Sequence, residues 1–236
     1  MIRIERLEKR YGALPVLAGI DLSIPGGAVT AVAGPNGSGK TTLLKSLLGL
    51  VRPDAGRILF DGAPLDEAGR YRARWGYMPQ AAHFPQNLKG SEILRFLKEL
   101  RGRAARPDEE LIDAFGLARE LDKPVRTLSG GNRQKLSAVA AFLFRPDVVI
   151  LDEPTAGLDP AASSTLKDKI LRERARGTTF ILTSHVMSEL EELSDRVVFL
   201  LGGRIHFEGP AGSMKTQTGQ VNLERAIAAL MRGVAA

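Results

Sequence analysis

A glycine-rich octapeptide, GPNGSGKT at residues 34–41, restricts the folds open to this 236-residue chain. It matches the pattern G-x-x-x-x-G-K-[ST] and lies between the apolar run Val29–Ala33 and a leucine-rich segment, Thr41–Leu50, with helical spacing. Glycines let successive backbone N–H groups turn inward around phosphate oxygens, and the start of a helix adds positive potential. This context predicts a nucleoside triphosphate site; the alternative is an ordinary glycine turn before a helix.

Two side chains of this loop suit the chemistry of phosphoryl transfer. Lys40 can reach the β- and γ-phosphates, and the hydroxyl of Thr41 is a suitable ligand for Mg²⁺. Such a site also needs an acidic group for the metal ion and a base for the attacking water.

Apolar runs later in the chain predict buried parallel strands at Val148–Leu151, Thr179–Leu182 and Val197–Leu201. Helices are expected between them, at Pro160–Arg176 and Val186–Leu193. Earlier strands are expected around Ile2–Leu7, Leu22–Ile24 and Gly56–Gly62, a hairpin return at Arg204–Glu208, and a short helix at Asn222–Met231. Helical spacing dominates from Ser91 to about Phe144. The chain is therefore predicted to be a β-α-β sheet with early added strands and a helical insert.

Two carboxylates follow the predicted strand at residues 148–151. Asp152 would hold Mg²⁺, directly or through water, and Glu153 can polarise the attacking water as a general base. Because strands of a parallel sheet present their carboxyl ends at one edge, both acids are expected near the phosphate site. The alternative is an acid pair that caps a helix.

A second anion-binding helix start is predicted at Leu128–Gln134, LSGGNRQ. A serine hydroxyl and two glycines there expose N–H groups before a helical run. One bound triphosphate does not need two anion-binding helix starts. The helix start at Leu128–Gln134 is therefore expected to bind the nucleotide of a second copy. A capped helix without a ligand is the alternative.

These motifs, in their order and spacing, make the chain resemble the nucleotide-binding subunit of an ATP-binding cassette (ABC) transporter, from its first strand to about Gly209. The resemblance implies an α/β fold with a P-loop NTPase (RecA-like) core, an antiparallel β-subdomain and an inserted helical subdomain. It implies one ABC ATPase domain over 1–236: a core with β-subdomain at 1–80 and 146–209, a helical signature subdomain at about 81–145, and a C-terminal tail with a short helix at 210–236.

The resemblance also assigns roles to single residues. Tyr11 is similar to the aromatic residue that stacks on adenine, where a core aromatic is the alternative. Gln80 is similar to the glutamine that meets Mg²⁺ and the attacking water, and Asp159 to an aspartate at the dimer contact. His185 is similar to the switch histidine that contacts the γ-phosphate and supports Glu153. Asn132 departs from the family, which more often has Gln there, so we expect some dimer contacts to shift while the Ser and Gly donors remain.

The expected site divides into catalytic, nucleotide-binding and metal-binding groups. The catalytic candidates are Glu153, His185 and Lys40. The candidates for contact with ATP are Tyr11, Gly34, Pro35, Asn36, Gly37, Ser38, Gly39, Lys40, Thr41, Thr42, Gln80, Ser129, Gly130, Gly131, Asn132 and Asp159. The candidates for Mg²⁺ are Thr41, Gln80 and Asp152.

Composition limits the setting in which such a site works. The chain has no cysteine, which excludes disulfides and thiolate metal sites, and its apolar runs are too short to cross a bilayer. The amino terminus is not a secretory signal. We expect a cytoplasmic protein, peripheral on the inner face of the membrane, which acts with a second cassette and with separate permease subunits. Identical chains are the expected arrangement of the two cassettes.

The resemblance favours ABC-2-type export systems, and among them the ATPases of copper-processing and nitrous-oxide-reductase maturation transporters. An importer subunit would share every motif. The net charge of +6 and the basic segments Arg70–Arg74 and Arg101–Arg106 suit an anionic partner or a solvated surface. They leave open a soluble ABC ATPase that drives assembly or nucleic-acid processing, although no specific nucleic acid is expected.

Overall fold

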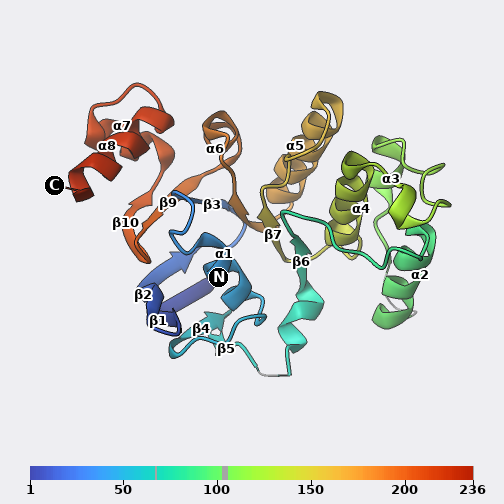
Figure 1. Cartoon of the computed structure of the whole chain (residues 1–236), viewed down its shortest axis with the longest axis horizontal. Helices are drawn as coiled ribbons and strands as arrows, with labels where there is room; N and C mark the ends of the chain where they lie inside the picture. Colours follow the sequence, from blue (N-terminus) through green and yellow to red (C-terminus); the bar gives the residue numbers. More distant parts are fainter. Residues whose placement is uncertain (67, 103–105, 236) are drawn as a thin grey trace. The chain divides into compact units, whose positions relative to one another are not determined.

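The computed structural model describes residues 1–66, 68–102 and 106–235 (Figure 1). Two compact units are formed, the first by Met1–Arg72 with Thr179–Ala236 and the second by Ala73–Thr178. The central residues of the basic segment Arg101–Arg106 lie outside the described residues. The limits given above for the core, the helical subdomain and the tail stay a prediction.

An antiparallel sheet begins the first unit, with the strand order β2-β1-β4-β5. Its strands are β1 (Ile2–Tyr11), β2 (Leu14–Ile24), β4 (Ala55–Phe60) and β5 (Ala63–Pro64). Ile2, Ile4 and Leu7, which suggested one extended segment, are all buried on β1. The early strand predictions are therefore confirmed: β1 and β2 extend further than the apolar spacing indicated, while β4 ends two residues before the predicted Gly62.

A second set of strands in this unit has the order β10-β9-β3-β8. These are β3 (Val29–Ala33), β8 (Thr179–Thr183), β9 (Arg196–Leu201) and β10 (Arg204–Gly209). β3 runs parallel to both β8 and β9, while β10 returns antiparallel to β9. Every residue of β3 and β8 is buried, which is why these strands are apolar apart from their threonines.

The helix after β3, α1 (Lys40–Leu47), ends three residues earlier than predicted. The hydroxyl of Tyr71 donates to the carbonyl of Leu47, and Arg72 donates to the carbonyl of Gly49, which has a φ of +65°. These bonds satisfy carbonyls that a continuing helix would have used. Part of the basic segment Arg70–Arg74, which forms a 3₁₀ helix (η1), thus closes the end of α1.

The first unit ends with three more helices: α6 (Met187–Leu193), α7 (Ala211–Thr218) and α8 (Leu223–Ala235). The predicted helices at 186–193 and 222–231 are confirmed. α7 was not predicted, because its small and polar residues bury only Met214 and carry no apolar periodicity. Glu191 of α6 binds Lys215 of α7 and the N–H of Leu223, so α6 anchors this region.

The second unit pairs β6 (Trp75–Met78) in parallel with β7 (Val148–Asp152). Its helices are α2 (Gly90–Arg101), α3 (Glu110–Ala114), α4 (Gly130–Phe142), α5 (Pro160–Ala175) and the 3₁₀ turn η2 (Val125–Thr127). α4 packs closely on β6: a Cβ at Gly76 would lie 2.1 Å from the carbonyl oxygen of Ala141. Among its described residues, the predicted helical stretch from Ser91 to Phe144 thus contains α2, α3, η2 and α4 rather than one continuous helix.

Candidate nucleotide-binding site

The glycine-rich loop connects β3 to α1 in the first unit (Figure 1), as its pattern predicted. Gly34 and Gly39 leave no space for a side chain. A Cβ at Gly34 would lie 2.1 Å from the carbonyl oxygen of Leu200, and one at Gly39 would lie 2.7 Å from that of Val16, where φ is +107°. The loop therefore rests directly on the backbone of β9 and β2 and takes its shape from them.

Polar groups within the loop are poised for an anion. The ammonium group of Lys40 donates to the carbonyls of Gly34 (2.7 Å) and Pro35 (3.1 Å), and this side chain is largely buried. The hydroxyl of Ser38 is buried and has no hydrogen-bond partner among the described residues. Asn36, Gly37 and Thr41 are exposed. A polyanion suits a loop with a buried ammonium group, an unsatisfied hydroxyl and exposed N–H groups.

His185 lies at the same edge of the first unit's parallel strands as this loop. Ala31 of β3 pairs with Leu182 of β8 in parallel register, and Gly34 and His185 each follow three residues later. Parallel strands end at one edge, so the loop and the histidine emerge together. The imidazole is exposed, whereas Ser184 before it is buried.

Tyr11 ends β1, opposite Leu14 of β2, and half of its surface is exposed. The alternative of a core aromatic is therefore wrong. The ammonium nitrogen of Lys9 lies 5.6 Å from the centre of its ring. Val16 and Leu17, a few residues along β2, contact the position of Gly39, so this strand leads from Tyr11 to the phosphate loop.

In the second unit, β6 and β7 bring Gln80 and the two acids to one edge. Met78 pairs with Leu151, and Gln80 and Glu153 each follow two residues later. Asp152 is buried at the end of β7; burial first, and the charge of Asp152 second, raise the pKa of Tyr77. Glu153 has a φ of +51°, a left-handed conformation that costs free energy at a non-glycine residue and is typical of functional sites.

The LSGGNRQ segment forms the start of α4. Ser129 is the N-cap, and its hydroxyl oxygen accepts the N–H of Asn132 at 3.1 Å. Ser129 and Gly130 are exposed. The side-chain amide of Asn132 donates to Glu120 at 3.1 Å, a contact that sequence reasoning missed because Glu120 belongs to a turn with no motif of its own.

Asp159 is the N-cap of α5, as an isolated Asp before Pro160 suggested, and its carboxylate also binds Lys135 of α4. This link between the loop before α5 and the LSGGNRQ helix was not predicted. The two segments also approach closely at Gly131, where a Cβ would lie 3.2 Å from the carbonyl oxygen of Gly157.

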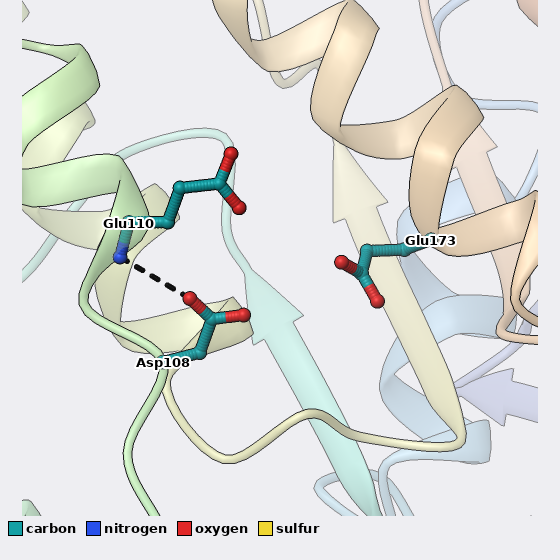
Figure 2. Close-up of side chains that lie close together, drawn as sticks. All are labelled: Asp108, Glu110 and Glu173. Carbon is teal, nitrogen blue, oxygen red and sulfur yellow. Dashed lines mark hydrogen bonds between the residues drawn. The ribbon is translucent and has the colours of Figure 1, made fainter.

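Three carboxylates elsewhere in this unit, those of Asp108, Glu110 and Glu173, have oxygens within 4.8 Å of one another (Figure 2). The ammonium group of Lys169 already binds all three, at 2.9, 2.8 and 3.0 Å respectively, and its side chain is 1% exposed. Lys169 is thus the shared cation of this cluster, while Arg145, Arg172 and Arg176 each pair with one of its carboxylates. We interpret the cluster as a partly buried ion-pair network that joins α5 to the start of α3.

Among the described residues, no helix is both long and apolar enough to cross a membrane.

The fold and the glycine-rich loop define a P-loop NTPase of the α/β class. Residues 17–156 match the family model described as ABC transporter. The chain belongs to this family, and it is an ATP-binding subunit that hydrolyses ATP.

Similar proteins agree with this assignment. The daunorubicin resistance ATP-binding protein DrrA3 of Streptomyces coeruleorubidus is 40% identical over 92% of this chain and 71% of its own length. The lantibiotic transport ATP-binding protein SrtF of Streptococcus pyogenes is 33% identical over 95% of this chain and 94% of its own. A solved ATP-binding subunit of an ABC transporter has a TM-score of 0.91 at 30% identity, over 98% of this chain and 99% of its own. The predicted fold class is confirmed.

Proposed function

We propose that this chain is the ATPase of an export-type ABC transporter, in which two copies close head to tail on two ATP·Mg²⁺ and drive separate permease subunits. The observation that carries the proposal is the phosphate loop. Gly34 and Gly39 have no room for side chains, and the loop opens at the strand edge where His185 also lies. A turn without a ligand would not need a buried ammonium group and an unsatisfied Ser38 hydroxyl.

The donor set for a metal ion consists of oxygen atoms: the hydroxyl of Thr41, the carboxylate of Asp152 and the amide of Gln80. Hard oxygen ligands suit Mg²⁺, which would neutralise charge on the phosphates when bound. Lys40 would leave the loop carbonyls that it now binds and donate to phosphate oxygens.

Within this proposal, Glu153 accepts a proton from the attacking water and His185 contacts the γ-phosphate and supports Glu153. Tyr11, half exposed, stacks on the adenine ring. Ser129, Gly130 and Gly131 donate to the nucleotide of the second copy, since the exposed N-terminus of α4 is free to meet an anion from outside the chain.

Export is favoured by the relatives, one of them named for daunorubicin resistance and one for lantibiotic transport. We propose a position on the inner face of the membrane, with the segment Ala81–Pro85, in which exposed and half-buried residues alternate, as a contact for the permease. The copper-processing subgroup stays a prediction.

The test is a Glu153→Gln chain, which keeps the shape of the side chain and removes the base. We expect an ATP-dependent dimer with Mg²⁺ by size-exclusion chromatography with light scattering, and hydrolysis slowed by about 10²–10⁴-fold. Glu224→Gln, an equivalent change at an exposed residue of α8, should do neither. A monomeric Glu153→Gln chain with undiminished hydrolysis would remove Glu153 from the mechanism.

The transporter assignment has its own experiment. Tagged Glu153→Gln chain would be held with ATP·Mg²⁺ in its native host, extracted from solubilised membranes, and its partners identified by mass spectrometry. We expect a stoichiometric polytopic membrane protein. Recovery of soluble or nucleic-acid partners alone, with the chain absent from membranes, would replace this proposal with a soluble ABC ATPase.

A further inference from the structure

A buried serine and a buried glutamate enclose the backbone on both sides of His185. The hydroxyl of Ser184 donates to a carboxylate oxygen of Glu189 at 3.0 Å, and its oxygen accepts the N–H of Val186 at 3.0 Å. The N–H of Glu189 in turn donates to the carbonyl of Val186 at 3.1 Å. These three bonds close a ring around the turn that carries His185.

The residues of this turn differ in their exposure to solvent. Ser184 is 5% exposed and Glu189 is 8% exposed, whereas the side chain of His185 faces outward. The hydroxyl uses its proton for the carboxylate and a lone pair for the N–H, so one group fixes two partners. A charge-assisted bond to a buried carboxylate is stronger than a neutral one.

A carboxylate is not needed here for packing. Leu190, next along α6, and Thr183, the last residue of β8, are fully buried without a charge. Burying Glu189 among them costs free energy, which its hydrogen bonds have to offset. Such a group at a surface turn is explained if the turn must be held in one conformation.

We propose that Ser184 and Glu189 are positioning residues for His185: their hydrogen bond holds the turn so that the imidazole stays aimed at the γ-phosphate. This inference rests on the role proposed for His185. Groups that act on a transferring phosphoryl group need placement within about 0.5 Å, and a shift of about 1 Å can slow a reaction about 10²-fold. In this proposal both side chains act through the imidazole and not by contact with the nucleotide.

The experiment measures hydrolysis of radiolabelled ATP under single-turnover and steady-state conditions. Ser184→Ala and Glu189→Ala should each lower kcat by about 10–100-fold while KM changes less than about twofold, because the loss concerns placement in the transition state. Glu189→Gln keeps an oxygen that can accept the hydroxyl proton, so it should retain most of the activity.

The distinguishing readout is the same pair of changes in a His185→Ala background. If the two residues act through the imidazole, they should slow the residual reaction no further. An equal slowing with and without His185 would show a general structural role and overturn the proposal. So would full activity in a folded Ser184→Ala chain.

Controls separate folding from placement. Glu191→Ala, on the same helix, removes bonds to α7 and α8 and should leave kcat unchanged. If Glu189→Ala does not fold, as judged by circular dichroism, Ser184→Ala decides the question alone. If His185→Ala hydrolyses ATP at the unchanged rate, the proposed role of His185 fails; if it is inactive while Ser184→Ala is not, only the present inference fails.

Discussion

The ammonium nitrogen of Lys135 lies 2.9 Å from Oδ2 of Asp159, while Oδ1 of the same carboxylate accepts the N–H of Ala162 at 2.8 Å. One carboxylate thus caps α5 and ties its first turn to the helix that begins with LSGGNRQ. The bond from Ala162, and then that from Lys135, lower the pKa of Asp159, so the group is charged at neutral pH.

The two bonds of Asp159 can be removed separately. Asp159→Asn keeps an oxygen for the cap and loses the ion pair, as Lys135→Ala does, whereas Asp159→Ala loses both. We expect the first two variants to behave alike and Asp159→Ala to lower Tm further, by about 2–4 °C. Differential scanning calorimetry checks this order. An equal Tm for all three variants would mean that the cap does not stabilise α5.

Glu120 should matter to the ATP-bound dimer through Asn132. With Glu153→Gln to stop hydrolysis, Glu120→Ala should weaken dimer formation about 2–5-fold, because the amide of Asn132 is then no longer held. In an Asn132→Ala background the same change should have no effect. Lys123→Ala, which removes the other partner of Glu120, serves as the control and should weaken the dimer less. Sedimentation equilibrium gives the dimer dissociation constant of each variant.

The Lys169 network should contribute strongly to stability. Lys169→Met leaves three carboxylates without their shared cation and should cost about 3–5 kcal/mol of the free energy of unfolding. Lys98→Met, which breaks a more exposed pair with Glu109 in the same unit, should cost less than about 1 kcal/mol. Urea unfolding measures both. Equal costs would show that burial of the network adds nothing.

The same network predicts a dependence on pH. Burial raises the pKa of Asp108, but bonds from Lys169 and from the N–H of Glu110 outweigh this, and the net result lies below 3.8. A depressed carboxyl pKa stabilises the fold above the unfolded value, and the contribution is lost as pH falls through the folded value. The stability gap between the unchanged chain and Lys169→Met should therefore be constant near neutral pH and narrow below pH 3.8.

The two tight glycines and Gly37 should respond differently to substitution. Gly39→Ala places a methyl group 2.7 Å from a backbone oxygen, so we expect loss of ATP binding or of folding. At Gly37 nothing lies within 4 Å of a Cβ, and only the positive φ of +78° opposes a side chain, a cost of about 1–2 kcal/mol. Gly37→Ala should therefore bind a fluorescent ATP analogue with moderately reduced affinity. Equal loss at both positions would contradict this account.

The parts of the fold that repeat a local pattern could be predicted from the sequence. Val29–Ala33 and Val197–Leu200 are almost wholly apolar because these residues are buried on both faces of the sheet. The phosphate loop needs glycine at fixed places. The ends of elements were less predictable: α1 stops where Tyr71 and Arg72, more than twenty residues away, bind its carbonyls.

Contacts between distant polar residues could not be predicted. Asp108 and Lys169 are 61 residues apart, and nothing in either segment indicates the other. The pair Ser184 and Glu189 is closer in sequence, but a glutamate in the first turn of a helix is ordinarily exposed, so its burial appears only in three dimensions. Residues that contact a ligand carry a motif, whereas the residues that hold them in place do not.

The carbonyl of Leu200 lies against Gly34, and the N–H of Gly203 donates to the carbonyl of Ser38. The backbone of the β9–β10 hairpin thus fixes the conformation of the phosphate loop. Because this hairpin contacts the phosphate loop at Gly34 and Ser38, we expect a one-residue insertion in it to change nucleotide affinity. We therefore expect residues 200–203 to tolerate as few substitutions as the glycine-rich motif itself. A survey of tolerated substitutions should include these residues with the motif.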